Sequence, residues 1–131
     1  MKQHLDSITF DSAEHGRAGA VAVGGLVFTD ATALYLGTLQ RVPEATTIAA
    51  ETRVCLDRLA ETLERAGCTL RDVVKVNSYL TDDAYRTEFW DVYNEVMAPG
   101  PYPVRLTQVG GLDGNARVML DVVAVRPGSG E

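Results

Sequence analysis

Apolar positions divide this chain into segments of two kinds. Four segments are rich in β-branched and other apolar residues, which favour extended strands: residues 18–29, 73–80, 104–109 and 116–125. The first is interrupted by Gly24 and Gly25, and glycine tolerates the positive φ that a two-residue turn requires. The pattern therefore predicts a hairpin near the N-terminus and three further strands.

Two other segments carry apolar residues at three- and four-residue spacing, which is the period of an amphipathic helix. The first segment begins at Ile48, behind Thr46 or Thr47 as the N-cap, and ends at Gly67. The second segment follows residues 81–83, which supply its N-cap, and must stop before the prolines that come after it. The sequence thus predicts two helices.

Residues 30–45 lie between the hairpin and the first helix and show no regular period, so we expect a long irregular connection there. The order of hairpin, helix, strand, helix and two strands predicts an α+β fold in which residues 1–131 form one domain. One sheet would carry both helices on one face. The other face is too apolar for water, so we expect it to pack against copies of the chain.

Charge and composition narrow the function further. The 131 residues carry a net charge of −6 and contain no basic run, which argues against nucleic acid as a partner. No apolar stretch approaches the roughly 20 residues of a membrane span, and the N-terminus lacks the apolar centre of a signal peptide. We therefore expect a cytoplasmic protein with no membrane association.

The chain has 2 cysteines, Cys55 and Cys68, within and just after the predicted first helix. No second pair and no histidine at ligand spacing accompanies them, so we expect no metal site and no cofactor. A disulfide between them would have to span most of a helix. We expect two buried or half-buried thiols.

Several segments together resemble the RidA family, also called the YjgF or L-PSP family. The resemblance rests on AVAVGGLVFT in the hairpin, AAETRVCLDRLAETLERAG in the first helix, DVVKVNSYLTD in the next strand, and PVR followed by VVAV near the end. It implies a homotrimer of chorismate-mutase-like α+β subunits with three clefts at the subunit interfaces. Typical members hydrolyse reactive enamines and imines to ketoacids and ammonia.

The same resemblance assigns Arg105, in the Pro-Val-Arg motif, to the carboxylate of the substrate, which suits the two-pronged geometry of a guanidinium. The alternative is a surface or interface arginine paired with an acidic residue. Where typical deaminases have a glutamate on the last strand, this chain has Met119, which exchanges no proton. Moving the strand by two residues to use Asp121 would disturb the register, and we do not favour it.

Other positions of the implied cleft also depart from the family pattern. Arg17, Asp30, Trp90 and Thr107 stand where typical members have tyrosine, serine, asparagine and cysteine. If these residues meet Arg105, the cleft suits an anionic and aromatic or conjugated ligand, and Asp30 is its main proton-transfer group. The alternatives are an exposed turn aspartate or an ion pair with Arg17 for Asp30, and interface packing for Trp90. His15 and Tyr102 are weaker candidates.

The leading hypothesis is a trimeric RidA-like protein that binds a small carboxylate-bearing imine, enamine or conjugated metabolite through Arg105 and Arg17. Asp30 would serve as the acid or base, and Trp90, Thr107 and Met119 would line the site. Because the glutamate is missing, ordinary 2-aminoacrylate or 2-iminopropanoate deaminase activity should be weak or absent. The alternatives are a non-catalytic ligand-binding or interaction trimer and an ordinary deaminase. A ribonuclease ranks last, because the chain is acidic and has no basic groove.

Overall fold

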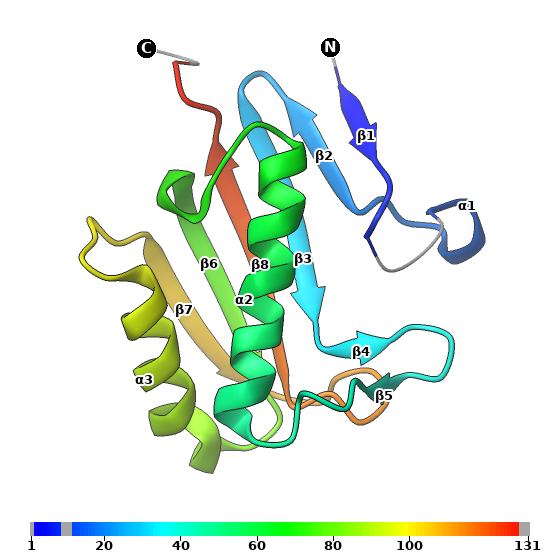
Figure 1. Cartoon of the computed structure of the whole chain (residues 1–131), viewed down its shortest axis with the longest axis vertical. Helices are drawn as coiled ribbons and strands as arrows, with labels where there is room; N and C mark the ends of the chain where they lie inside the picture. Colours follow the sequence, from blue (N-terminus) through cyan, green and yellow to red (C-terminus); the bar gives the residue numbers. More distant parts are fainter. Residues whose placement is uncertain (1, 9–11, 129–131) are drawn as a thin grey trace.

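A computed structural model describes residues 2–8 and 12–128 of the chain (Figure 1). The strands are β1 (Gln3–Leu5), β2 (Ala20–Val23), β3 (Leu26–Thr32), β4 (Leu34–Tyr35), β5 (Gln40–Arg41), β6 (Val73–Leu80), β7 (Val104–Val109) and β8 (Val118–Val125). The helices are α1 (Ser12–His15), α2 (Ile48–Arg65) and α3 (Arg86–Met97), with short 3-10 turns at Leu70–Asp72 and Asp83–Tyr85. The predicted hairpin, both long helices and the three later strands are confirmed.

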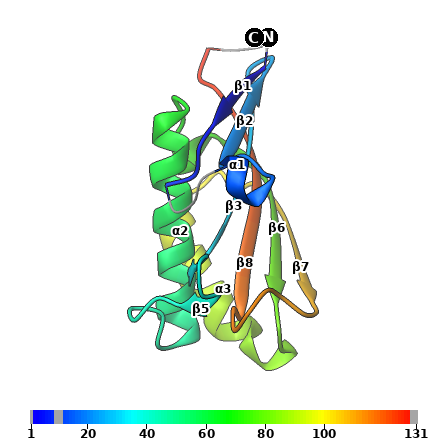
Figure 2. The same ribbon diagram turned by 90° about the vertical axis from the view of Figure 1, so that its right-hand side faces the viewer.

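The main sheet has 6 strands in the order β1-β2-β3-β8-β6-β7. Neighbouring strands run antiparallel except β6 and β7, which are parallel. Helices α2 and α3 lie on the same face of this sheet, as the two perpendicular views show (Figures 1 and 2). The predicted α+β architecture is therefore correct, and it leaves β7 at one edge of the sheet.

Helix α2 begins and ends as its sequence predicts. The Thr47 side chain accepts a hydrogen bond from the backbone N of Ala50 at 3.0 Å, which satisfies one of the free N–H groups of the first turn. The helix ends before Gly67, whose φ of 85° lies in the left-handed region that glycine adopts without strain. Apolar side chains of α2, including the fully buried Cys55 and Leu63, pack against the sheet.

A buried carboxylate also joins α2 to β8. Glu51 has an exposed fraction of 0%, and its Oε1 accepts from Nε of Arg117 at 2.7 Å. Its Oε2 accepts from the backbone N–H groups of Arg117 and Val118 at 2.7 and 3.0 Å. These contacts satisfy a charge that would otherwise be costly inside the protein. The sequence pattern of the helix did not single out Glu51.

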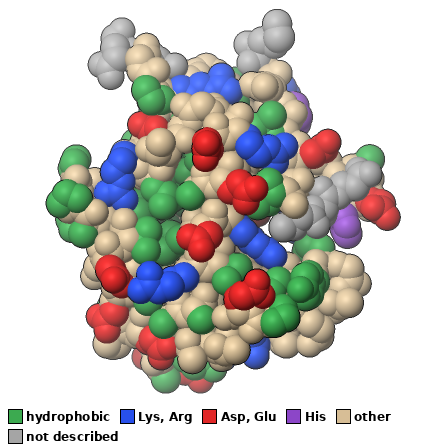
Figure 3. Space-filling model, viewed as in Figure 1, with side chains coloured by type: hydrophobic (Ala, Val, Ile, Leu, Met, Phe, Trp, Pro, Cys, Tyr) green, Lys and Arg blue, Asp and Glu red, His purple; other side chains and the backbone are tan. Residues whose placement is uncertain are grey.

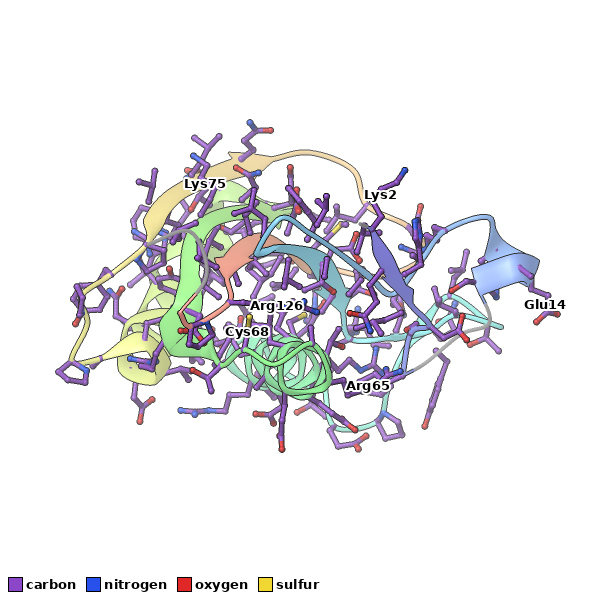
Figure 4. The ribbon with its side chains drawn as sticks, turned by 90° about the horizontal axis from the view of Figure 1, so that it is seen from above. Lys2, Glu14, Arg65, Cys68, Lys75 and Arg126 are labelled. Carbon is purple, nitrogen blue, oxygen red and sulfur yellow. The ribbon has the colours of Figure 1, made fainter. Side chains whose placement is uncertain are left out.

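Along each strand, side chains alternate between the buried face that carries the helices and the outer face of the sheet. One row of paired residues crosses four strands on the helical side and consists of Thr29, Val122, Val76 and Arg105. The next row lies on the outer side and consists of Asp30, Asp121, Asn77 and Leu106. The outer face exposes large apolar side chains: Leu26 at 38%, Phe28 at 41%, Val104 at 65% and Leu106 at 45%. Lys75 lies on this side of the sheet, opposite α2 (Figure 4).

Three details differ from the sequence prediction. Asp30 belongs to β3 and is not the start of an irregular connection, because β3 continues to Thr32 by pairing with β8. Strands β4 and β5 form a separate 2-stranded sheet within the expected connection. The short strand β1, which pairs with β2, was not predicted because three residues are too few for a periodic signal.

No helix in the described part of the chain has the length and apolar composition that a membrane span requires. On the helical face of the molecule, acidic and basic side chains are interspersed without a continuous basic stripe (Figure 3).

Candidate functional site

Arg105 lies on the edge strand β7, where the register opposite Val76 turns its side chain toward the helical face. Its guanidinium carbon lies 5.1 Å from the ring centre of Trp90 and 5.0 Å from that of Tyr93, both on α3. Atom Nη1 of Arg105 is buried and has no hydrogen-bond partner among the described residues. The cation therefore contacts two aromatic rings and retains an unused donor.

A hollow of about 300 Å³ adjoins this guanidinium. Its lining residues are Tyr93, Asn94, Tyr102, Pro103 and Arg105. The buried Tyr93 hydroxyl likewise lacks a partner among the described residues. Burial raises the pKa of Tyr93, while the nearby positive charge of Arg105 acts in the opposite direction. Tyr93 is therefore a protonated phenol at neutral pH, and two of the side chains that line the hollow each carry a buried donor without a partner among the described residues.

Trp90 is held in place from the side of the sheet. Its Nε1 donates to Oγ1 of Thr107 at 3.2 Å, and that hydroxyl lies 3.0 Å from Oγ of the buried Ser78. Ser78 donates its proton to the carbonyl of Leu106 at 2.8 Å. Because Ser78 has one hydroxyl proton, Thr107 is the donor in the contact between the two hydroxyls. A directed chain of hydrogen bonds thus runs from Trp90 through Thr107 and Ser78 to the backbone.

A second arginine borders the same indole. The guanidinium carbon of Arg86 lies 5.9 Å from the Trp90 ring centre, and Nη1 of Arg86 approaches the backbone carbonyl of Thr107 at 3.4 Å. Arg86 also pairs with Asp83, so its charge is partly compensated. The Arg105 guanidinium has no such acidic partner among the ion pairs of the described residues.

Arg17 and Asp30 form a second, separate cluster. Nη1 of Arg17 lies 3.8 Å from Oδ1 of Asp30, and both side chains are about two-fifths exposed, at 41% and 43%. Burial raises the pKa of Asp30; the positive charge of Arg17 opposes this effect and the negative charge of Asp121 adds to it. The ion pair is one of the alternatives stated for Asp30, and the raised pKa is the property that proton transfer requires.

The Arg17–Asp30 cluster borders a narrow hollow of about 30 Å³ at the edge of β3 beyond its pairing with β2. Arg58 of α2 also lines this hollow and donates to the carbonyls of Thr32 and Leu34 at 2.7 and 2.9 Å. The space admits about one water molecule and no metabolite. Within one chain it is therefore not a substrate pocket.

Met119 lies on the outer face of the sheet, paired with Thr32 on β3 and Tyr79 on β6. Asp121 follows two residues later on the same face, opposite Asp30, and Nδ2 of Asn77 lies 3.4 Å from its Oδ2. The thioether of Met119 supplies no acid or base. Asp121 contributes to the cluster through its effect on the pKa of Asp30.

The candidate residues thus gather in two places. Arg105 and Thr107 both contact Trp90 on the helical side of β7, whereas Arg17 and Asp30 pair at β3. Sequence reasoning missed Tyr93 and Ser78 as parts of the first cluster. Tyr93 stands one helical turn after Trp90, which is a spacing that places both on one side of a helix. Ser78 is a buried polar residue inside an apolar strand, and such a residue signals a hydrogen-bond partner.

The described residues contain no cluster of three or more histidine, cysteine or acidic side chains that could hold a metal ion. Both cysteines are free and buried. Burial raises the pKa of the Cys55 thiol strongly, with a further rise from the charge of Glu51. Burial also raises the pKa of Cys68, which lies close to the end of α2 near Arg126 (Figure 4). Thiols of this kind are poor nucleophiles at neutral pH.

Comparison with known proteins connects this arrangement to a family. Residues 17–126 match the family described as "Endoribonuclease L-PSP". The mitochondrial protein mmf2 of Schizosaccharomyces pombe is 40% identical over 92 residues, 70% of each chain. The RutC family protein YjgH of Escherichia coli is 30% identical over 112 residues, 82% of this chain and 83% of YjgH.

A crystal structure from Mycobacterium tuberculosis, described as a member of the YjgF/YER057c/UK114 family, superposes with a TM-score of 0.77 at 26% identity. The superposition covers 95% of this chain and 99% of that one. The name of the fission yeast relative places that protein in mitochondria, so a cytoplasmic location for this chain stays a prediction. The sequence match across both clusters and the shared architecture establish that this chain belongs to the RidA, YjgF or L-PSP family.

Proposed function

We propose that this protein binds a small carboxylate-bearing metabolite through Arg105. The observation that carries the proposal is the Nη1 of Arg105, which is buried and has no hydrogen-bond partner among the described residues, in a side chain that lines the 300 Å³ hollow. A buried charged donor without a partner is costly, and a carboxylate is the ligand that matches it in charge and geometry. Tyr93 lines the same hollow, and its buried hydroxyl is a second donor without a partner among the described residues.

The complete site, in this proposal, lies between subunits of a homotrimer. Asp30 and Arg105 are on strands separated by β8 and β6, hence about 14 Å apart at the usual spacing of strands, and they face opposite sides of the sheet. Arg17 and Asp30 therefore reach a ligand on Arg105 only from a second copy of the chain. The apolar side chains of the outer face supply a surface through which copies can associate.

The reaction proposed for this cleft is hydrolysis of an imine or enamine, or a related step on a conjugated acid. In the hydrolysis of an imine, water adds to the carbon of the C=N bond and a proton goes to nitrogen. The C–N bond then breaks, and ammonia and a ketoacid result. Arg105 orients the carboxylate, and Asp30, with its raised pKa, exchanges the protons. Met119 takes no part, so turnover of 2-aminoacrylate and 2-iminopropanoate is expected to be weak or absent.

A non-catalytic binding protein is the second candidate. One specific observation favours it: none of the five residues lining the hollow beside Arg105 is a carboxylate or a histidine. In that case the cleft would keep its anion anchor without the groups needed for proton transfer. The two candidates share Arg105 and differ in what Asp30 does.

Two measurements test these alternatives. Calorimetric titration with pyruvate, with methyl pyruvate as the uncharged control, measures carboxylate binding in the wild type and in Arg105→Ala. We expect Arg105→Ala to abolish pyruvate binding while the oligomer remains intact in size-exclusion chromatography. Equal binding in both proteins, or equal binding of the ester, would refute Arg105 as the anchor.

The second measurement follows ketoacid and ammonia release from freshly generated 2-aminoacrylate and 2-iminopropanoate. Asp30→Asn is compared with Asp57→Asn, which changes an exposed aspartate on α2. Turnover that Asp30→Asn removes and Asp57→Asn preserves supports catalysis. Binding without any turnover supports the second candidate. Acceleration as fast as that of a typical deaminase would show that Met119 is no obstacle and that the protein is an ordinary deaminase.

A further inference from the structure

The hydrogen-bond chain from Trp90 to the backbone begins at a ring that contacts Arg105, the residue that the proposed function places against the ligand. Trp90 makes two directional contacts at once: its ring faces Arg105 at 5.1 Å, and its Nε1 donates to Thr107 at 3.2 Å. An indole that is fixed at its nitrogen cannot rotate without losing that hydrogen bond. The orientation of the ring beside Arg105 is therefore determined by Thr107.

Thr107 is itself fixed from two sides. Its hydroxyl accepts from Trp90 and donates to Ser78, whose exposed fraction is 0% and whose proton goes to the carbonyl of Leu106. This arrangement uses the one proton of each hydroxyl. The Thr107 hydroxyl therefore has its proton and an acceptor site committed within the chain. Its role is to support Trp90 and not to contact a substrate.

The surroundings of Arg105 explain why such support matters. The two rings stabilise the positive charge through their faces, but a ring face accepts no hydrogen bond of ordinary strength. The guanidinium thus contacts two rings while its Nη1 donor has no hydrogen-bond partner among the described residues. If the Trp90 ring turned away, the long arginine side chain would be free to adopt other rotamers. The entropy lost on ordering it again would then lower the affinity for the ligand.

We infer that Thr107 and Trp90 are positioning residues that hold the Arg105 guanidinium against Tyr93, beside the hollow that the Arg105 side chain lines. This inference rests on the proposed function and deepens it. Trp90 does not line the hollow beside Arg105; Tyr93, Asn94, Tyr102 and Pro103 do. In this arrangement a carboxylate meets Arg105, and Trp90 supports the guanidinium from outside the hollow, whose aromatic lining is Tyr93 and Tyr102.

The test uses pyruvate titrations of the assembled protein and four variants. Thr107→Val keeps the size of the side chain and removes its hydroxyl, whereas Thr107→Ser keeps the hydroxyl. Thr87→Val also replaces threonine by valine, but at an exposed position of α3, and it is the matched control for Thr107→Val. Trp90→Phe keeps a ring beside Arg105 without the N–H. Trp90 is also the only tryptophan among the 131 residues, so its emission reports on this one position.

We expect Thr107→Val to weaken pyruvate binding about tenfold, the size of effect that loss of one hydrogen bond and its ordering produces. Thr107→Ser should stay within about twofold of the wild type, Thr87→Val should match it, and Trp90→Phe should fall between the wild type and Thr107→Val. In the ligand-free protein, Thr107→Val should shift the Trp90 emission maximum and Thr107→Ser should not.

Unchanged binding in Thr107→Val, or equal losses in Thr107→Val and Thr107→Ser, would overturn the positioning role while leaving Arg105 as the anchor. If the wild type fails to bind pyruvate, the proposed function fails, and the emission measurement still decides whether Thr107 orients Trp90. If Thr107→Val does not fold, the comparison of Trp90→Phe with Thr107→Ser replaces it, because Trp90→Phe removes the same hydrogen bond from its other end.

Discussion

Asp30 and Leu106 lie in one row across the sheet, so Arg105, the neighbour of Leu106, faces the opposite side from Asp30. Four strands take part in this row, and β8 and β6 separate the two ends. A ligand held by Arg105 therefore cannot touch Asp30 of the same chain. If both residues serve one ligand, each cleft takes them from two different subunits.

This relationship predicts complementation between two defective proteins. Arg105→Ala and Asp30→Asn should each be inactive on a substrate that the wild type turns over. If the protein forms the proposed trimer, mixed trimers refolded from equal amounts of the two variants should regain about a quarter of wild-type activity. Each cleft of a head-to-tail interface then receives each intact residue with a probability of about one half. Activity is measured as ketoacid release. No recovery in mixed oligomers would place both residues in the same subunit's site or remove Asp30 from the reaction.

Loss of the Glu51 carboxylate should destabilise the fold strongly. Glu51→Gln weakens or breaks three hydrogen bonds at a position with 0% exposure and leaves Arg117 without its counter-charge. We expect the free energy of unfolding to fall by about 2 to 4 kcal/mol, toward the lower part of the range for broken buried pairs because Arg117 is partly exposed. Urea denaturation at pH 7 measures the change.

The matched control for Glu51 is Glu95→Gln, which removes the partner of Arg53 in an ion pair of 2.6 Å whose side chains are 50% and 66% exposed. Exposed pairs contribute little, so this change should cost under about 1 kcal/mol. Equal effects of the two substitutions would mean that the buried carboxylate is not the link between α2 and β8.

The raised pKa of Asp30 predicts a pH-dependent contribution to stability of definite sign. The folded protein holds this proton more tightly than the unfolded chain, in which the aspartate has its ordinary pKa of about 3.8. Between that value and the raised folded pKa, stability therefore falls as pH rises. The penalty of the ionised form is fully present above the folded pKa and is relieved as pH falls through it.

Asp30→Asn removes this titrating group. As pH rises from about 3.5 to 7, the unfolding free energy of the variant should therefore increase relative to that of the wild type. Urea unfolding at several pH values gives both curves. A difference that moves toward the wild type with rising pH would show that the Arg17 charge outweighs burial at Asp30.

Neither cysteine should react with a thiol reagent in the folded protein. Cys55 is 0% and Cys68 2% exposed, and burial raises the pKa of both thiols. Titration with Ellman's reagent at pH 8 should detect no rapidly reacting thiol in the native protein and 2 per chain in denaturant. Fast modification of Cys68 without denaturant would indicate that the end of α2 opens readily.

Local sequence was enough to predict most of the secondary structure. The apolar period of α2, its Thr47 cap and its end before Gly67 are all properties of neighbouring residues, and the hairpin at Gly24 and Gly25 is equally local. The same holds for the strands β6, β7 and β8, whose composition favours extended backbone. The sequence also identified Arg105 as a candidate, because the Pro-Val-Arg motif that supports the family resemblance is a run of consecutive residues.

The environment of each site residue depended instead on partners that are far apart in the chain. Asp30 is a strand residue because β3 pairs with β8, and burial in the folded chain raises its pKa, with a smaller addition from Asp121 opposite to it. Glu51 is buried because the start of β8 covers it. Trp90 contacts Thr107 only because β7 packs against α3, which no periodicity in either segment encodes.

The sequence alone was thus enough to predict which segments are helices and strands, because backbone preference and apolar period are local properties. It also identified Arg105, through the Pro-Val-Arg motif. The folded chain decided that Arg105 stands against two aromatic rings with an unused donor, and that Asp30 lies beyond its reach across the sheet. Distances, burial and charge neighbours arise only when strands from different parts of the chain pair, and these quantities govern pKa values and ligand contacts.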